Sequence, residues 1–566
     1  MKPDQVTLEI ISSALLYASE EMGLALRNSA YSPNIKERMD HSAAVFDETG
    51  RLLAQAEHIP VHLGSLPWGL RNLIDSCAHA GVELEEGSMV ASNNPYITGT
   101  HLNDVTVAAP IHHKGELLAF VVNKAHHSDV GGVVPGSISM EARTLREEGF
   151  ILEPVALWRR GEFVAPVIER FACASRTPSE RRGDLKAQVA ANISGVRRVR
   201  ELIAKYGIQA FRDAGAHSFS HSEALTRRRL AAFRHGTFQA SDFLEGQAGK
   251  DLEIRARVTI GPPGVAIDYS GTSAEVDYPL NAVFGVTLSG AYFVLRCLLG
   301  DDIPANHGAF APLKVTAPER TIVNPSYPRP VGGGNVETSQ RNVDTILRAL
   351  APAARGRVPA ASGGSMNNVM IGGRAGRRTW VFYETIGVGL GGGRGRDGVD
   401  GIQANMTNTM NTPIEEIERT LPILVVRYEF RPDSSGAGTF RGGSGLIRAF
   451  KALEDGTTFT VLAERERRPP WGLEGGGPGV GTEVILTEAG VRRSVGTKTT
   501  LRLGRGDMVE VRTAGGGGFG KPAGRDPRLV RADLSNGLIS PAKARLDYGQ
   551  TASEAHPARR PSRKLS

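Results

Sequence analysis

The stretch GTHLNDVTVAAPIHHKGELLAFVVNKAHHSDVGG, residues 99–132, contains two apolar runs separated by a turn. The first run covers residues 104–109, the second covers 117–122, and Lys114-Gly115 lies between them. Two such runs on either side of a glycine turn predict a β-hairpin. Residues 43–54 repeat the pattern. We therefore predict two β-hairpins that belong to a buried sheet.

Helical and strand patterns alternate along the rest of the chain. Apolar residues at helical spacing predict helices over residues 5–29, 178–235 and 280–299, whereas residues 251–269 alternate as a strand does. Residues 331–520 hold 38 of the 68 glycines, in short strands separated by turns.

Together these patterns predict a mixed α+β, multi-domain fold with β-hairpin-rich sheets, a helical middle segment and a glycine-rich, β-rich C-terminal half. We assign residues 1–240 to an N-terminal α/β region, 241–520 to a mixed, glycine-rich and β-rich region, and 521–566 to a basic tail. No period of 20–50 residues occurs, which argues against a solenoid.

The composition is typical of a folded protein in a reducing compartment. The 566 residues are 40% hydrophobic and 22% charged, which excludes wholesale disorder, collagen and coiled coil. Three widely spaced cysteines without a CxxC argue against a disulfide framework or a thiolate zinc site. We find no signal-peptide pattern and no apolar stretch near the ~20 residues of a membrane helix. We therefore expect a cytoplasmic protein with no membrane partner.

The positive net charge is concentrated at the C-terminus. The formal charge is +7, and the residues from Lys521 onward contain ten basic and four acidic side chains. This distribution favours a solvated, partly ordered tail over a nucleic-acid-binding arm, so we expect no nucleic-acid partner. The tail either folds onto the body through residues 534–548 or remains mobile.

A candidate metal site lies at the open end of the 104–122 hairpin. His101 and Asp104 lie at the start of its first predicted strand, and His126 lies at the end of the second. Because neighbouring strands lie about 5 Å apart, these side chains can meet at one edge of the sheet. Imidazole and carboxylate ligands suit Zn, Mn or Fe(II), and three protein ligands leave a position for water or substrate. Asp40 would join them if both hairpins share a sheet; the alternative is that all four residues are turn formers and caps.

Other polar residues near this site have weaker support. His127 and Asp129 adjoin the candidate ligands in sequence, and from this adjacency we assign them a role in proton transfer. Four further histidines are weaker candidates for metal binding: His58, His62, His112 and His113.

Two glycine-rich runs, residues 391–398 and 515–520, could cradle an anion through backbone N–H groups. However, neither ends in the GKS or GKT of a P-loop, and no GxGxxG fingerprint follows a predicted strand. We interpret both as turns of special φ that pack against other backbone. The chain also lacks the GxSxG elbow of one class of serine hydrolases.

Several short motifs occur in a specific order along nearly the whole chain. They are ERMDHS (37–42), HIPVHLGS (58–65), NPY (94–96), HLND (101–104), HHSDVGG (126–132), PGS (135–137), EG (148–149), GDLKAQ (183–188), DYSGT (268–272), GGGNVETSQ (332–340), PIE (413–415) and GGGGFG (515–520). In this order, over residues 4–550, the chain resembles the hydantoinase B / 5-oxoprolinase family, which includes the B subunit of N-methylhydantoinase and a large subunit of acetone carboxylase.

The resemblance implies a subunit of a larger enzyme. It implies a hydantoinase A-type, actin-like ATPase partner that binds ATP, in a heterotetramer of two A and two B subunits. It also implies ATP-dependent opening of a small cyclic amide or imide, such as a hydantoin, 5-oxoproline or a similar lactam. The family's divalent metal would be held by His101, Asp104 and His126, and by Asp40.

Three hypotheses follow. In the first, the partner phosphorylates the carbonyl oxygen of the cyclic amide, and this chain presents a metal-activated water that opens the ring. In the second, the chain is a subunit of an ATP-dependent ketone carboxylase of the acetone carboxylase type. In the third, it is a non-catalytic scaffold that stabilises the ATPase.

Overall fold

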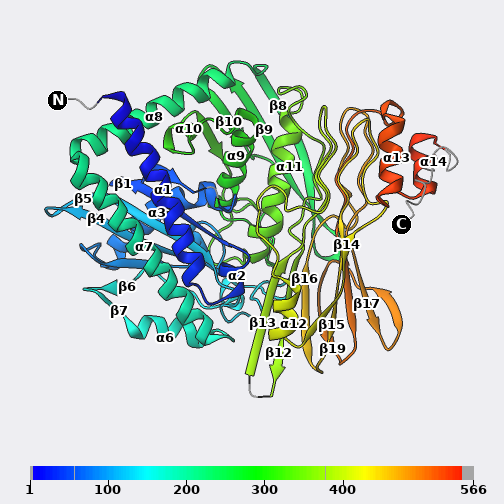
Figure 1. Ribbon diagram of the computed structural model, residues 1–566, viewed down its shortest axis with the longest axis horizontal. Coiled ribbons are helices and arrows are strands. Elements are labelled where there is room, and N and C mark those ends of the chain that lie inside the picture. The colour runs from blue at the N-terminus through cyan, green and yellow to red at the C-terminus, as the bar shows by residue number, and fades with distance from the viewer. Residues whose placement is uncertain (1–3, 57, 377, 551–566) are drawn as a thin grey trace, which may run out of the picture.

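The computed structural model describes residues 4–56, 58–376 and 378–550, and these form four β-sheets, with most of the helices gathered in one part of the molecule (Figure 1). The sheets are mainly antiparallel, with one parallel pair between β10 and β11. This architecture confirms the predicted mixed α+β class.

A seven-stranded sheet carries the candidate site. Its strands are, in spatial order, β2 (Leu52–Gln55), β1 (His41–Asp47), β5 (Glu116–His126), β4 (Asp104–His113), β3 (Met89–Ser92), β6 (Val155–Arg159) and β7 (Glu162–Phe163). Both predicted hairpins are present, as β1–β2 and β4–β5, and pairing of β1 with β5 joins them. The prediction of two hairpins in one buried sheet is therefore confirmed.

Three further sheets follow along the chain. The second contains β11 (Leu313–Thr316), β10 (Gly264–Asp268), β9 (Asp251–Gly261) and β8 (Gly236–Glu245). The third contains β13 (Arg378–Thr385), β12 (Asn368–Ala375), β16 (Thr457–Leu462) and β19 (Lys498–Leu503). The fourth contains β14 (Ile423–Phe430), β15 (Leu446–Ala452), β20 (Met508–Arg512), β17 (Glu483–Glu488) and β18 (Val491–Ser494).

Most of the helices lie around the first two sheets, and few lie beside the other two (Figure 1). They are α1 (Gln5–Ser29), α2 (Pro33–Lys36), α3 (His62–Ala80), α4 (Pro95–Thr98), α5 (Leu145–Glu148), α6 (Ala165–Ala174), α7 (Pro178–Tyr206), α8 (Ile208–Leu230), α9 (Phe284–Leu299), α10 (His307–Phe310), α11 (Ser339–Leu350), α12 (Ile414–Thr420), α13 (Pro527–Ser535) and α14 (Pro541–Tyr548). The helices predicted over residues 5–29, 178–235 and 280–299 correspond to α1, to α7 with α8, and to α9. Among the residues that the structure describes, no helix has the length and apolarity to cross a membrane.

The seven-stranded sheet is buried on both faces. Ala43 and Val45 of β1 belong to the core shared with α1 and α7, whereas Ala44 and Phe46 belong to the core shared with α3. Successive side chains of a strand point to opposite faces, so one strand supplies both cores. The sheet is thereby held between helical layers, which fixes the strand ends that carry the candidate ligands.

The largest hydrophobic core includes residues from both sides of position 240, from Ile11 to Leu462. A second core lies between the third and fourth sheets. The division of the chain near residue 240 stays a prediction.

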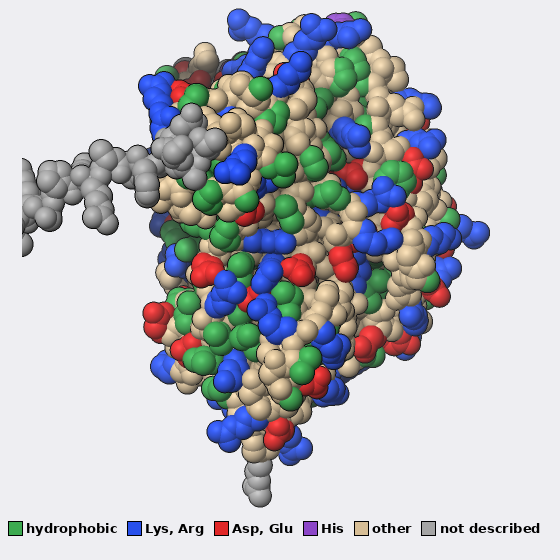
Figure 2. Space-filling view, turned by 90° about the vertical axis from the view of Figure 1, so that its right-hand side faces the viewer, with side chains coloured by type: hydrophobic (Ala, Val, Ile, Leu, Met, Phe, Trp, Pro, Cys, Tyr) green, Lys and Arg blue, Asp and Glu red, His purple; other side chains and the backbone are tan. Residues whose placement is uncertain are grey.

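The C-terminal segment folds onto the body as far as residue 550. Arg525 donates hydrogen bonds to Asp397 and to Asp533 of α13, with N–O distances of 2.7–2.8 Å. Of the two predicted states of the tail, folding through residues 534–548 is the one observed, as α14 and the end of α13. Figure 2, which views the right-hand side of Figure 1, shows basic and acidic side chains interspersed over this face. The rest of the predicted tail, residues 551–566, lies outside the described residues.

The glycine-rich runs pack backbone against backbone. A Cβ on Gly516 would lie 2.0 Å from the carbonyl oxygen of Leu390, and one on Gly442 would lie 1.9 Å from that of Gly516. Packing against other backbone is therefore confirmed. The predicted special φ is found in these two runs only at Gly395 and Gly520, so close approach is the reason for most of their glycines.

Candidate metal centre

The ends of three adjacent strands bring the candidate ligands together. Asp104 begins β4 and is paired directly with His126 at the end of β5. The backbone N–H of His126 donates to the carbonyl of Asp40, just before β1, over 3.0 Å. His101 precedes β4 by one turn, because its carbonyl accepts from the N–H of Asp104 over 3.0 Å. Sheet hydrogen bonds therefore place these four residues at one edge.

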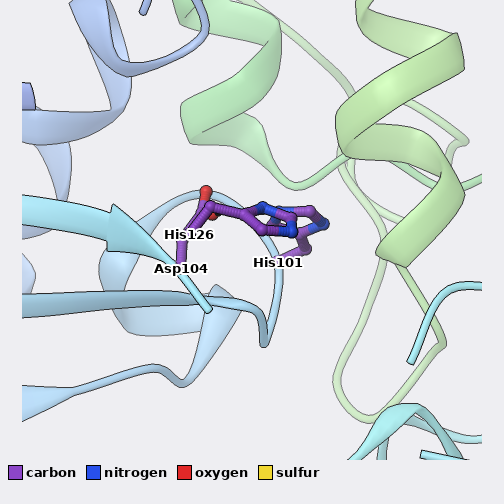
Figure 3. Close-up of side chains that lie close together, drawn as sticks. All are labelled: His101, Asp104 and His126. Carbon is purple, nitrogen blue, oxygen red and sulfur yellow. Dashed lines mark hydrogen bonds and ion pairs between the residues drawn. The ribbon is translucent and has the colours of Figure 1, made fainter. Parts of the chain in front are cut away.

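Three side chains converge on one point, as Figure 3 shows. The Nε2 atom of His101 lies 3.0 Å from Oδ1 of Asp104 and 3.1 Å from Nδ1 of His126. The Nδ1 atom of His126 lies 3.1 Å from the same Oδ1. Ligand atoms about 2.1 Å from a single ion stand roughly 3 Å apart, so this spacing fits one divalent cation. All three residues are buried.

Asp40 and His62 flank this triad. The Oδ2 atom of Asp40 is 3.9 Å from Nδ1 of His126, so Asp40 lies beside the triad but farther from His126 than the 3.0–3.1 Å that separate the triad's own ligand atoms. The Nε2 atom of His62 is 3.3 Å from the other carboxylate oxygen of Asp104, and its Nδ1 is 2.9 Å from the hydroxyl of Ser42. His62 therefore holds Asp104 in place, which is how partners of metal ligands orient them.

The protonation states favour metal binding. Burial alone would raise the pKa of Asp104, but the charge of His101 and hydrogen bonds from His101, His126 and His62 hold it well below its ordinary value. Burial lowers the pKa of His126 and of His62, so their rings are neutral near pH 7. An ionised carboxylate and neutral imidazoles are the forms that bind cations.

A cavity of about 20 Å³ adjoins the triad, enough for about one water molecule. The ring of Tyr383 stacks on His126 with centroids 4.7 Å apart and forms part of its wall. Asn335 also lines it, is 3% exposed, and has an Oδ1 atom without a hydrogen-bond partner among the described residues. Neither residue was among our candidates, although Asn335 lies in the GGGNVETSQ motif.

His127 and Asp129 lie apart from this cluster. The Nε2 atom of His127 is 3.0 Å from Oε1 of Gln188, and its ring meets Phe171 edge-on. The carboxylate of Asp129 accepts from the backbone and guanidinium of Arg176, and from the N–H groups of Gly131 and Gly136. The structure therefore brings together Asp40, His101, Asp104 and His126, but not the two residues assigned to proton transfer.

Glu337, two residues from Asn335, is expected to make stability depend on pH. It belongs to the π-helical turn Gly334–Thr338, and its Oε1 accepts from the side chain of Asn368 and the backbone of Met366. Burial and the nearby charge of Glu464 raise the pKa of Glu337 well above 4.5. The carboxyl is therefore protonated in the folded state at pH values where the unfolded chain is ionised.

We expect Glu337→Gln to flatten the decline of stability with pH. The contribution of the protonated carboxyl is complete below about pH 4.5 and is lost as pH rises toward its pKa in the folded protein, by about 1.4 kcal/mol per pH unit. Gln keeps the Oε1 acceptor but cannot ionise. Thermal unfolding from pH 5 to 7 measures the difference, with Glu319→Gln at an exposed position as control. If the stability of wild type and that of Glu337→Gln changed with pH in the same way, this expectation would be contradicted.

The sequence matches the family model described as hydantoinase B/oxoprolinase over residues 4–522. The chain belongs to the hydantoinase B/oxoprolinase family. An uncharacterized protein of Methanocaldococcus jannaschii is 45% identical over 96% of both chains. The putative B subunit of a D-/L-hydantoinase from a Pseudomonas species is 30% identical over 98% of this chain and 96% of its own.

Some relatives in this family are longer. The 5-oxoprolinase of Dictyostelium discoideum is 34% identical over 92% of this chain, but the match spans only 40% of that protein. The chain thus corresponds to about two fifths of such a 5-oxoprolinase.

Two solved structures share the fold. The ATP-dependent caprolactamase of Pseudomonas jessenii superposes with a TM-score of 0.90 and 29% identity, over 97% of both chains. A nucleotide-free acetone carboxylase superposes with a TM-score of 0.89 over 96% of this chain and 79% of its own, and at 19% identity it shows the fold alone. The resemblance read from the sequence motifs is confirmed at the level of the family.

Proposed function

We propose that this chain is the B-type subunit of an ATP-dependent hydrolase that opens small cyclic amides or imides. The observation that carries the proposal is the buried cluster of His101, Asp104 and His126, set in a fold that matches a caprolactamase from end to end. The names of the relatives, a 5-oxoprolinase and the B subunit of a hydantoinase, support the same substrate class.

We propose that His101, Asp104, His126 and Asp40 hold a divalent cation, Zn, Mn or Fe(II). When bound, such an ion would act as a Lewis acid and lower the pKa of a water molecule toward ~7. His62 keeps Asp104 ionised and oriented, and Tyr383 covers one face of His126. The cavity beside them has room for about one water molecule.

In this proposal, a partner subunit binds and hydrolyses ATP. The chain contains no P-loop ending in GKS or GKT, and a relative is named as a subunit. We propose a hydantoinase A-type ATPase as that partner, in a cytoplasmic heterotetramer of two A and two B subunits. The partner would phosphorylate the amide carbonyl oxygen, because an unactivated lactam is a poor electrophile.

The test combines the purified chain with a hydantoinase A-type ATPase subunit of the same organism. We expect ATP-dependent ring opening of at least one of hydantoin, 5-oxoproline and ε-caprolactam, measured by chromatography of the open-chain product. Each subunit alone is the control and should give no product. Bicarbonate-dependent ATP turnover with ketones, without ring opening, would instead indicate the carboxylase alternative. Ring opening by the ATPase alone would indicate a scaffold.

A further inference from the structure

A cleft of about 480 Å³ opens next to the candidate metal centre. Its wall is mainly apolar, with Ile59, Phe293 and Cys297 among the residues that line it. Gln55, His58 and Asn408 supply polar groups. Binding sites for small molecules have this character, with apolar walls and a few polar groups that fix orientation.

Only a thin wall separates this cleft from the cavity at the metal centre. Ile59 lines both spaces. Asn408 lines the cleft, while its neighbours Thr407 and Thr409 line the inner cavity. The side chain of Asn408 donates a hydrogen bond to the carbonyl of His58 over 2.5 Å and so ties the two wall segments together. Ile59 and the residues beside it therefore separate a molecule in the cleft from the inner cavity.

The polar groups of the cleft suit a neutral amide. Gln55 Oε1 and His58 Nδ1 are buried and have no hydrogen-bond partner among the described residues. The Nε2 atom of His58 faces the carboxylate of Glu20 over 3.9 Å, which places the ring proton on Nε2 and leaves Nδ1 as an acceptor. Both atoms can therefore accept an N–H group of an amide or imide. The guanidinium of Arg296 donates to the backbone carbonyls of Ile303 and Asp301. Arg296 and Asp301 both line the cleft, so their opposite charges offset each other and leave no net positive charge to bind a carboxylate.

We propose that this cleft is the binding site for a small neutral lactam or imide ring, held beside the metal centre before the ring is opened. The inference rests on the proposed function, and it adds the location of the substrate-binding site and a preference of that site for neutral rings. Neutral rings such as ε-caprolactam and hydantoin should bind there better than 5-oxoproline, which carries a carboxylate.

Cys297 provides a direct test, because this residue lines the cleft and is accessible to solvent. Burial against the surrounding wall raises the pKa of this thiol to about 11, so alkylation by N-ethylmaleimide is slow and can be followed at pH 8.5. ε-Caprolactam at about ten times its Kd should slow the alkylation about tenfold. Cys173 is exposed outside the cleft and should react at an unchanged rate, which peptide mass spectrometry measures in the same sample. Equal rates at Cys297 with and without ε-caprolactam and hydantoin would overturn the proposal.

A second test uses a substitution at the same position. Cys297→Phe fills the cleft and should raise KM for ε-caprolactam about tenfold, with kcat and metal content little changed. Cys173→Phe, which adds the same bulk at an exposed cysteine outside the cleft, is the matched control and should keep KM near that of wild type. An unchanged KM for a folded, metal-containing Cys297→Phe variant would contradict the proposal.

The two proposals fail in different ways. Protection of Cys297 without ring opening by the complex would retain the cleft as a lactam site and defeat the proposed hydrolase. Ring opening without protection, and with normal KM in Cys297→Phe, would retain the hydrolase and defeat the cleft.

Discussion

Replacing His126 with Ala should remove both the bound cation and the ring-opening activity. The substitution deletes one atom of a triad whose members lie 3.0–3.1 Å apart, and it leaves Asp40 without its imidazole neighbour. Loss of a residue that only orients a ligand costs roughly 10–100-fold in metal affinity or activity, and loss of a ligand should cost more. Elemental analysis of the purified protein measures the metal, and the reconstituted complex measures the activity. We expect His101→Ala to behave in the same way.

A control for this experiment lies at the other end of the same hairpin. His113 is at the tip of the β4–β5 hairpin, partly exposed, and outside the cluster. His113→Ala should keep the metal content and the activity of wild type. Full retention of metal and activity in both His101→Ala and His126→Ala would refute the metal centre.

Asp184→Ala should strongly destabilise the folded protein. The carboxylate of Asp184 accepts hydrogen bonds from the backbone N–H groups of Tyr31 and Ser32 and from the guanidinium of Arg181, all within 3.0 Å. The side chains of Asp184 and Arg181 are fully buried. Removing one partner of a buried ion pair costs about 3–5 kcal/mol. Glu180 lies 3.2 Å from the same guanidinium nitrogen and still compensates part of the charge, so we expect a loss near the lower end of this range. The free energy of unfolding, from denaturant titration, measures this cost.

The effect of Asp184→Ala should extend to the metal centre. Arg181 also donates to the hydroxyl of Ser128, two residues after His126, and Ser32 caps the short helix that leads to Asp40. Asp184→Ala should therefore weaken metal retention as well as stability. Asp75→Ala, at an exposed position of α3, is the matched control and should stay within about 0.5 kcal/mol of wild type. A similar small change in Asp184→Ala would show that this ion pair contributes little.

The hairpins and the convergence of their ends could be predicted because both depend on local sequence. Apolar runs on either side of Gly50 and Gly115 specify the hairpins, and hydrogen-bond pairing then brings Asp104 opposite His126. The position of Asp40 beside these residues could be predicted with one further assumption, that both hairpins belong to the same sheet.

The surroundings of the cluster could not be predicted in the same way. His62, Asn335 and Tyr383 come from a helix, a π-helical turn and a strand far away in the sequence, and only tertiary packing brings them to the cluster. The roles of His127 and Asp129 were inferred from adjacency alone. His126 stacks on Tyr383 whereas His127 contacts Phe171, which shows that neighbours along an extended chain face different surroundings.

The direct pairing of Asp104 with His126 means that the separation of these two ligands is set by the length of the hairpin rather than by the pocket around them. A single-residue deletion near Lys114-Gly115, far from the cluster, would shift the strands past each other and exchange inward for outward side chains along β5. The length of this hairpin does not set the distances between the residues that line the neighbouring cleft. Evolution could therefore reshape the cleft for rings of different size while the hairpin kept the ion-binding geometry unchanged.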